Sequence, residues 1–464
     1  MSDPVAREAG LRRELTSGQL TMIAIGGAIG TGLFLGSSIA IRLAGPGVIV
    51  AYAAGAVVAL LMSVALADLA VRHPAAGSFG VHAEIYQGPW AGFTVRWSYW
   101  FAQVIQIGGE VVASSLYAQF WLPEVPLWAF VLLFSGIVVG VNAMHVGAFG
   151  TFEYWFAMIK VVAIVLFILF GLAILLGLRT APASVPGAAG YRPFAPFGFK
   201  GIWLALPVVM FSYLGTEIVA VTAGEARDPE RAIPRALRAT VGRLILFYVV
   251  AMALLLALVP WRAVGTDKSP FVRVFEMMGI PAAATVMNFV VLTAALSSIN
   301  TNLYLTSRML FSLARGSGAP AVFGRLGARG TPVAALLAST AGMGVAAIVS
   351  KLIPSDAFLF LFGLAIFGGL YVWAQIFVTH LRFLSGKGGA QGHGGTGARE
   401  GDTPPLPPPP WRFAASLIGL VLMLAVIVTT WWIPGMRVTL QAGIPWLAFL
   451  TLAWWATRRR AAAR

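Results

Sequence analysis

The sequence predicts an all-α integral membrane protein with twelve transmembrane helices, and three observations indicate this class. First, 59% of its 464 residues are apolar and only 11% are charged, whereas about 25% of the residues in soluble proteins are charged. Second, twelve apolar runs reach the length of about 20 residues that a helix needs to cross a bilayer. Third, tryptophans gather at the ends of these runs, as they do at membrane–water interfaces. A soluble domain, a coiled coil and a disordered chain are excluded by this composition.

The twelve apolar runs follow one another along most of the chain. They lie near 17–42, 46–71, 92–120, 126–146, 152–178, 201–223, 239–260, 282–313, 331–350, 356–383, 413–433 and 441–457. Gly45, Pro46 and Gly47 mark the boundary between the first two runs, so we expect a tight turn there. The segment 384–412 is rich in glycine and then in proline, which predicts a flexible cytoplasmic linker with a stiff end.

The distribution of lysine and arginine predicts the orientation in the membrane. With the N-terminus in the cytoplasm, the cytoplasmic segments carry 22 of the 32 basic residues and the opposite side carries 9. An excess of basic residues marks cytoplasmic loops. We therefore expect both tails, 1–16 and 458–464, in the cytoplasm, and we attribute the net charge of +15 to orientation rather than to nucleic-acid binding. The first 15 residues are polar, so we expect no secretory signal peptide.

Two predicted spans contain sequence that disfavours a continuous helix. The first span has four glycines between Gly26 and Gly32, and a glycine in a helix interior costs up to about 1 kcal/mol relative to alanine. The sixth span has the polar string Phe211–Glu217 at its centre. Broken backbone in a membrane survives only where it lines a cavity or binds something, although close packing through small residues is an alternative for the glycines.

The two breaks occupy corresponding positions in the chain. Each lies about ten residues after the start of its span. The first and sixth spans are therefore equivalent if the chain contains two five-helix repeats of opposite orientation, at 17–178 and 201–383, followed by two more spans in 413–457. Paired interrupted helices in two halves are typical of a transporter binding site.

Several strings resemble one known family. They are Leu15-Thr16 with the Gly26–Gly32 run, Pro74–Phe79, Glu153–Phe156 leading to Lys160, Ser212–Glu217, Ala223–Pro229, Ile233–Ala236, Leu303-Tyr304 and Ser307–Leu310. With them the sequence resembles the amino acid permeases of the amino acid–polyamine–organocation (APC) superfamily, in its bacterial amino acid transporter branch. The resemblance covers about 11–383 and continues more weakly to the end. It implies a 5+5 inverted-repeat, LeuT-like fold with broken first and sixth helices, alternating access and a place in the bacterial cytoplasmic (inner) membrane.

The two breaks suit an amino acid zwitterion as the substrate. Exposed N–H groups at the first break would hold the carboxylate, because the N-terminus of a half-helix favours an anion. Free carbonyls at the second break would accept the ammonium group. The candidate substrate-binding residues in the breaks are Ala28, Gly30, Thr31, Phe211, Ser212 and Gly215. In relatives an aromatic residue at the position of Phe211 closes over the substrate, and a lipid-facing or core aromatic is the alternative.

Ionisable residues within spans are costly and need a reason. Lys160 lies about eight residues, or roughly 12 Å, from the cytoplasmic end of its span. In sodium-independent relatives a lysine here is thought to occupy the position of a coupling sodium, which implies proton coupling; a purely structural charge is the alternative. Glu217 could bind the substrate amine, respond to pH or hydrogen-bond the broken backbone. Glu110, in the third span, is expected to reflect substrate selectivity unless it pairs elsewhere. Asp68 is a cytoplasmic-side gate or packing residue.

No constellation typical of an enzyme or of a metal site is visible in the sequence. Cysteine is absent, and the five histidines, which show no ligand spacing, are expected in loops: His73, His82, His145, His380 and His393. The sequence thus predicts a non-enzymatic transporter that imports amino acids by proton symport, with the proton gradient as driving force and no cofactor or metal. A carrier of cationic amino acids, amines or polyamines, which could be an exchanger, is the alternative. The expected partners are the substrate and membrane lipid, with the protein a monomer or a homodimer.

Overall fold

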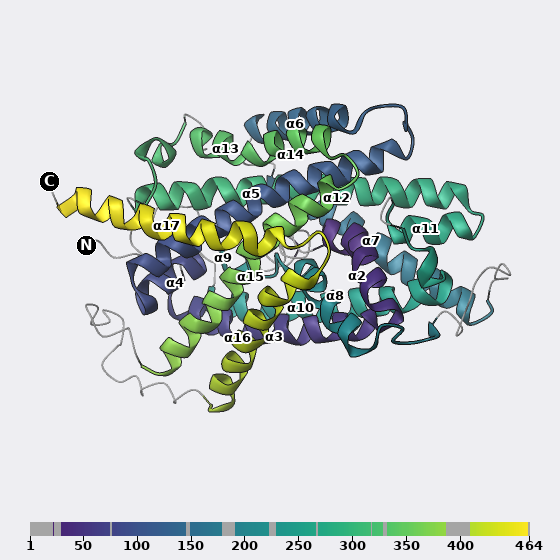
Figure 1. Cartoon of the computed structure of the whole chain (residues 1–464), viewed down its shortest axis with the longest axis horizontal. Coiled ribbons are helices and arrows are strands. Elements are labelled where there is room, and N and C mark those ends of the chain that lie inside the picture. The colour runs from purple at the N-terminus through teal and green to yellow at the C-terminus, as the bar shows by residue number, and fades with distance from the viewer. Residues whose placement is uncertain are drawn as a thin grey trace.

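The computed structural model describes residues 22, 29–74, 77–144, 149–178, 191–221, 229–265, 268–316, 318–327, 332–386 and 409–462. All regular elements of this described part are helices, and it contains no strand (Figure 1). The N-terminal tail, Ala28 and most of the predicted linker lie outside it. The α-helices are α2 (Ser37–Ala44), α3 (Val48–Arg72), α4 (Ser78–Gln87), α5 (Pro89–Gln119), α6 (Leu127–Met144), α7 (Phe149–Leu175), α8 (Gly198–Tyr213), α9 (Ile218–Val221), α10 (Pro229–Leu258), α11 (Pro270–Met277), α12 (Pro281–Arg315), α13 (Val333–Ser339), α14 (Ala341–Leu352), α15 (Ala357–Leu384), α16 (Trp411–Thr429) and α17 (Val438–Ala462).

Nine helical segments of the described chain are long and apolar enough to cross a membrane. The first of them, Gly32–Arg72, covers parts of the first two predicted spans. The third and fourth predicted spans correspond to α5 and α6, which are not among the nine. The apolar part of α6 is shorter, and α5 has 31 residues but carries buried polar side chains. The all-helical membrane class is thus confirmed, and the number of twelve spans stays a prediction.

The turn expected between the first two spans is present. A short 3-10 helix, η3 (Gly45–Gly47), joins α2 to α3. Gly45 has a φ of +60°, a conformation that side chains with a Cβ rarely adopt. A Cβ atom on Gly45 would also lie 2.5 Å from Cγ of Pro196. Both reasons require glycine here, and the turn brings α2 and α3 together against α8.

Helix α5 lies at the centre of the bundle (Figure 1). It packs against α12, α15, α4, α14 and α6. The contact with α14 is made by backbone, because a Cβ atom on Gly108 would lie 2.5 Å from the carbonyl oxygen of Gly342. Close approach through small residues is how helices associate in lipid, where no hydrophobic force drives them together. This packing leaves the polar face of α5 directed into protein.

Two histidines correct the expectation that all five lie in loops. His380 is 1% exposed in α15, with its Nε2 atom 3.0 Å from Oδ2 of Asp68 and its Nδ1 atom 2.7 Å from Oγ of Ser416. Arg412 donates to both carboxylate oxygens of Asp68 at 2.9 Å. Asp68 is therefore a junction between the ends of α3, α15 and α16, where it accepts hydrogen bonds from the side chains of two other helices. His82 is fully buried in α4.

The buried His82 predicts a loss of stability in acid. Helix α4 lies between two predicted spans, and Nε2 of His82 bonds the carbonyl of His73 at 2.9 Å. Burial lowers the pKa of His82 from 6.5 to about 4. The unfolded chain therefore takes up a proton at higher pH than the folded one. The stability from neutral His82 is complete above pH 6.5 and is lost as the pH falls toward 4, on the order of 3 kcal/mol in total.

We expect the melting temperature of the detergent-solubilised protein to fall over this pH interval. His82→Gln, which keeps a donor for the carbonyl of His73, is expected to flatten the fall. An equally steep fall in the variant and in the unmodified protein would show that other groups carry the acid sensitivity.

Candidate functional site

The helix break predicted in the sixth span is present. Helix α8 ends at Tyr213, and Leu214 is extended with a ψ of 141°. Gly215 has a φ of +104°, which favours glycine. The chain becomes helical again only at Ile218, where α9 begins. Turn bonds replace those of a continuing helix, since the N–H of Leu214 bonds the carbonyl of Phe211 and the N–H of Thr216 bonds that of Tyr213.

The first span is irregular in the same way where the structure describes it. Ile29 and Gly30 form a bend, and a π-helix, η2, follows over Gly32–Gly36. Single π-helical turns inside helices frequently mark functional sites, because they disturb the regular backbone bonding. Thr31 is 1% exposed, and its hydroxyl has no hydrogen-bond partner among the described residues. Ala28, the remaining candidate of this break, lies outside the described residues.

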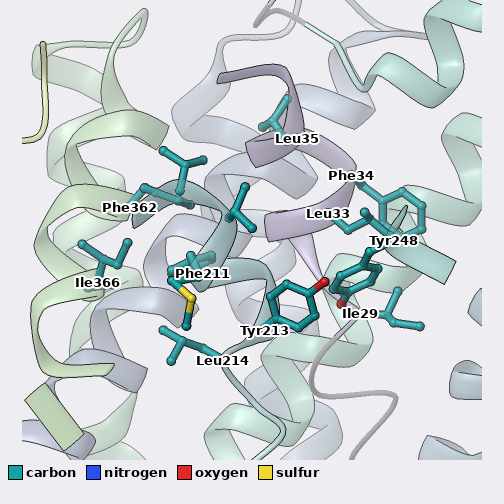
Figure 2. Close-up of a cluster of buried hydrophobic side chains, with 14 of the residues drawn as sticks. Ile29, Leu33, Phe34, Leu35, Phe211, Tyr213, Leu214, Tyr248, Phe362 and Ile366 are labelled. Carbon is teal, nitrogen blue, oxygen red and sulfur yellow. The ribbon is translucent and has the colours of Figure 1, made fainter. Parts of the chain in front are cut away.

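The two breaks lie against each other. A Cβ atom on Gly32 would lie 3.0 Å from Cα of Ser212 and 3.0 Å from Cδ1 of Phe211. This spacing is tighter than ordinary van der Waals contact, so position 32 admits only glycine without a shift of the second break. Figure 2 shows the neighbouring Leu33 and Ile29 in the same buried cluster as Phe211. The two irregular segments are thus in direct contact.

Glu110 of α5 reaches the first break. Its carboxylate is 1% exposed, and Oε1 accepts hydrogen bonds from Oγ of Ser298 at 2.7 Å and from Nε2 of Gln106 at 3.3 Å. A Cβ atom on Gly30 would lie 2.9 Å from the same oxygen. Sequence reasoning missed Ser298, which comes from α12. The signal for it was the pair Ser297-Ser298 within an apolar span.

An aromatic wall covers the other side of the breaks. Phe211 is 5% exposed and packs on Phe362 of α15 with ring centroids 4.2 Å apart. Phe362 in turn contacts Phe358, and Ile366 of α15 lies beside Phe211 in Figure 2. Phe211 therefore does not face lipid.

Two tyrosines hold the second break in place. The hydroxyl of Tyr52, on α3, lies 3.4 Å from Oγ of Ser212. Tyr213 donates its hydroxyl proton to the carbonyl of Tyr52 at 2.9 Å. Both tyrosine side chains are fully buried. Tyr52 was not among the predicted site residues, because nothing in its apolar span distinguishes it from a packing residue.

Glu217 binds the broken backbone itself. Its Oε2 atom accepts the N–H of Gly215 at 2.9 Å and the indole N–H of Trp373 at 3.1 Å. Its Oε1 atom accepts the hydroxyl of Tyr99 at 3.4 Å. Of the three roles open to Glu217, the geometry shows the hydrogen bond to the backbone. Trp373, on α15, is a further residue that the sequence did not single out.

Lys160 is fully buried in α7. That helix packs against α10 and α12, so the ammonium group lies inside protein rather than in lipid. Burial of a lysine at this depth calls for a function or a partner.

The arrangement combines backbone donors, backbone carbonyls, one buried carboxylate near each break and an aromatic wall. Such a set can bind both ends of a zwitterion and enclose its side chain. Within the described ranges, no group of three or more His, Asp or Glu side chains is placed to hold a metal ion.

Comparison with known proteins identifies similar sequences over nearly the whole chain. The model of the family described as amino acid permease matches residues 19–462. The chain is 41% identical to an uncharacterised amino acid permease, YtnA, of Bacillus subtilis, over 80% of this chain and 81% of the relative. It is also 41% identical to the gamma-aminobutyric acid permease of that organism, over 81% and 80% of the two chains. The aromatic amino acid transport protein AroP of Escherichia coli K12 is 37% identical over 96% of this chain and 95% of its own.

Proposed function

Since this chain belongs to the amino acid permease family, we propose that it imports amino acids across the bacterial cytoplasmic membrane by alternating access and proton symport. The observation that carries the proposal is the contact between the two broken helices at Gly32 and Ser212. Irregular backbone in a membrane protein needs a cavity or a ligand, and paired breaks of this kind are where secondary transporters bind their substrates.

In this proposal the substrate zwitterion lies across the two breaks. The N–H groups around Gly30 and Thr31 hold its carboxylate, together with Ala28. The carbonyls near Ser212 and Gly215 accept its ammonium group, since the end of a half-helix carries partial negative charge.

The substrate side chain then extends between the two walls of the site. Phe211 closes over it on the aromatic wall. Glu110 borders it on the other wall, where a buried carboxylate next to the first break influences which side chains fit. This placement makes Glu110 the residue through which we expect selectivity to act.

Proton coupling in this proposal rests on Lys160. Burial disfavours the charged form of a lysine, so the ammonium group needs stabilising contacts. A change of conformation can supply or remove these contacts. Lys160 then takes up a proton from one side of the membrane and releases it to the other. This exchange links the proton gradient to the conformation of the helices around α7. No cofactor is needed, because the gradient is the driving force.

Closure of one side of the site supports alternating access. Phe271 of α11 is fully buried, with its ring centroid 5.3 Å from that of Phe34 and 4.9 Å from that of Phe167. Helix α11 lies at the end of the bundle opposite to α4 (Figure 1). From the distribution of basic residues in the sequence, we expect the end that holds α11 to face the outside of the cell. Outward opening then requires Phe271 to separate from Phe34.

The test is uptake by the purified protein in liposomes, with and without an inwardly directed proton gradient. The competitors are the twenty amino acids, gamma-aminobutyrate and common polyamines. We expect at least one amino acid to compete and the gradient to drive its accumulation. Competition by no amino acid would contradict the main proposal. Competition by polyamines or cationic amino acids alone would support the alternative, a carrier of cationic amino acids or amines. Uptake that is the same with and without the proton gradient would contradict symport.

A further inference from the structure

A stripe of polar side chains runs along one face of α5. It consists of Tyr99, Gln103, Gln106 and Glu110, which we call the α5 stripe. Their spacing of four, three and four residues places them on one face of the helix. None is more than 9% exposed. Buried polar side chains are costly unless they are hydrogen-bonded, so each residue of the stripe needs a partner or a function.

The α5 stripe connects the two buried carboxylates of the site. At one end Gln106 donates to Oε1 of Glu110 at 3.3 Å. At the other end Gln103 lies one helical turn from Tyr99 and its hydroxyl, on the same face of α5. That hydroxyl in turn donates to Oε1 of Glu217 at 3.4 Å. Glu110 lies at the first helix break and Glu217 at the second, so the stripe bridges the breaks by a route separate from the backbone.

Helix α12 completes the path. Ser298 bonds Glu110 at 2.7 Å, and Asn288 bonds the carbonyl of Tyr117 at 2.8 Å. These two contacts show that α12 runs antiparallel to α5, and they place Asn302 at the level of Gln106, one turn beyond Ser298.

Two polar atoms in the middle of this path need partners. The amide nitrogen of Asn302, a donor, and Oε1 of Gln103, an acceptor, are buried and have no hydrogen-bond partner among the described residues. Buried polar groups are almost always satisfied. An ordered water can bridge a donor on one helix and an acceptor one turn away on the facing helix. The two amides thus point to water held in line between the carboxylates.

We propose that the α5 stripe is a proton relay between Glu110 and Glu217. The Glu110 carboxyl releases its proton to water held by Gln106, Gln103 and Asn302. A proton passes from this water to the oxygen of Tyr99 as Tyr99 gives its own hydroxyl proton to Glu217. Glu110 ends as a carboxylate and Glu217 as a carboxylic acid, and the amides and Tyr99 are unchanged. This inference rests on the proton coupling proposed above.

The groups around the two ends fit such a transfer. Glu110 faces Ser298 of α12, Gly30 of the first break and, on its own helix, Gln106 and Tyr117. Glu217 faces Tyr99, Trp373 and the N–H of Gly215. The next charged residue of α5 beyond Tyr99 is Arg96, which forms an ion pair with Glu84 at 2.9 Å. The relay therefore ends at Tyr99 and Glu217.

Gln103→Leu tests the relay, because leucine is similar in size and cannot orient water. Two rates are measured in liposomes with a substrate identified by competition: accumulation driven by a proton gradient, and exchange of labelled for unlabelled substrate, which needs no net proton movement. We expect accumulation to fall about tenfold or more, the effect of leaving a buried hydrogen bond unmade, with exchange kept within about twofold. Gln103→Glu, which restores a proton-carrying group, is expected to accumulate substrate again.

Gln119→Leu is the matched control, the same change on the same helix. Gln119 bonds the carbonyl of Val125 at 2.9 Å, away from the stripe, and we expect both rates to stay unchanged. Unaltered accumulation by Gln103→Leu would overturn the relay, and so would an equal loss of accumulation and exchange, which indicates a structural role. A failure of the unmodified protein to accumulate substrate while it exchanges would instead refute proton symport, and the relay with it.

Discussion

Replacing Lys160 with glutamine is expected to slow substrate accumulation driven by a pH gradient severely while exchange continues. Glutamine keeps most of the length and polarity of lysine but carries no proton at any physiological pH. Lys160 is fully buried in α7, so solvent water does not reach this position to carry a proton in place of the lysine. We expect a loss of about 100-fold in the accumulation rate, equivalent to a coupling free energy of about 3 kcal/mol. The measurement is uptake into liposomes at equal and at opposed internal and external pH.

Lys351→Gln provides the matched control for this prediction. Lys351 is exposed at the end of α14, so loss of its charge is expected to leave both exchange and accumulation intact. Full accumulation by Lys160→Gln would show that Lys160 is a structural charge and that another group couples transport to the proton. Loss of exchange together with accumulation would indicate that the buried ammonium group holds the fold.

Gly32→Val is expected to weaken substrate binding. A Cβ atom at this position would meet Cα of Ser212 and Cδ1 of Phe211 at 3.0 Å, and valine adds two methyl groups beyond it. The second break then has to move away from the first, which separates the two groups of backbone atoms that we propose to hold the substrate ends. Overpacking of this kind costs about 1–3 kcal/mol. We therefore expect affinity to fall by about 10- to 100-fold, measured as substrate-dependent stabilisation of the purified protein.

Gly136→Val separates crowding from the general effect of valine in a membrane helix. Gly136 lies in α6, and a Cβ atom there would meet nothing within 4 Å. We expect the control to bind substrate as the unmodified protein does. Normal binding by Gly32→Val would mean that the contact between the breaks is not part of the site. A variant that fails to fold is distinguished by its loss of a cooperative melting transition.

The class of the protein and its helix breaks followed from local properties of the chain. Lipid as solvent requires long apolar helices, and this requirement acts on each segment by itself. The break in the sixth span could be predicted because the polar string Phe211–Glu217 stands out from its apolar flanks, and the structure shows it at Leu214 and Gly215. The turn at Gly45 was predictable for the same reason, since proline and glycine act on their own backbone.

Several residues of the site could not be predicted in this way. Ser298, Tyr52 and Trp373 lie in spans that are apolar on most sides. In a soluble helix the polar face marks the outside, but lipid and protein interior are both apolar, so hydropathy carries little information about which side of a membrane helix faces the site. The expectation that His380 lies in a loop failed for a related reason. Its partners, Asp68 and Ser416, are remote in sequence, and only packing brings them to it.

The sequence by itself determined that the chain belongs in lipid, where its backbone breaks and which of its ionisable groups are costly enough to matter. It left open what those groups meet. Glu110 had either a selectivity role or a partner elsewhere, and the register of α12 against α5 places it beside Gly30 and Ser298. Glu217 had three roles, and the return of the chain after Gly215 folds its carboxylate onto the broken backbone. Breaks and burial costs are properties of one segment, whereas contacts depend on how separate helices are rotated and staggered, which only the tertiary structure decides.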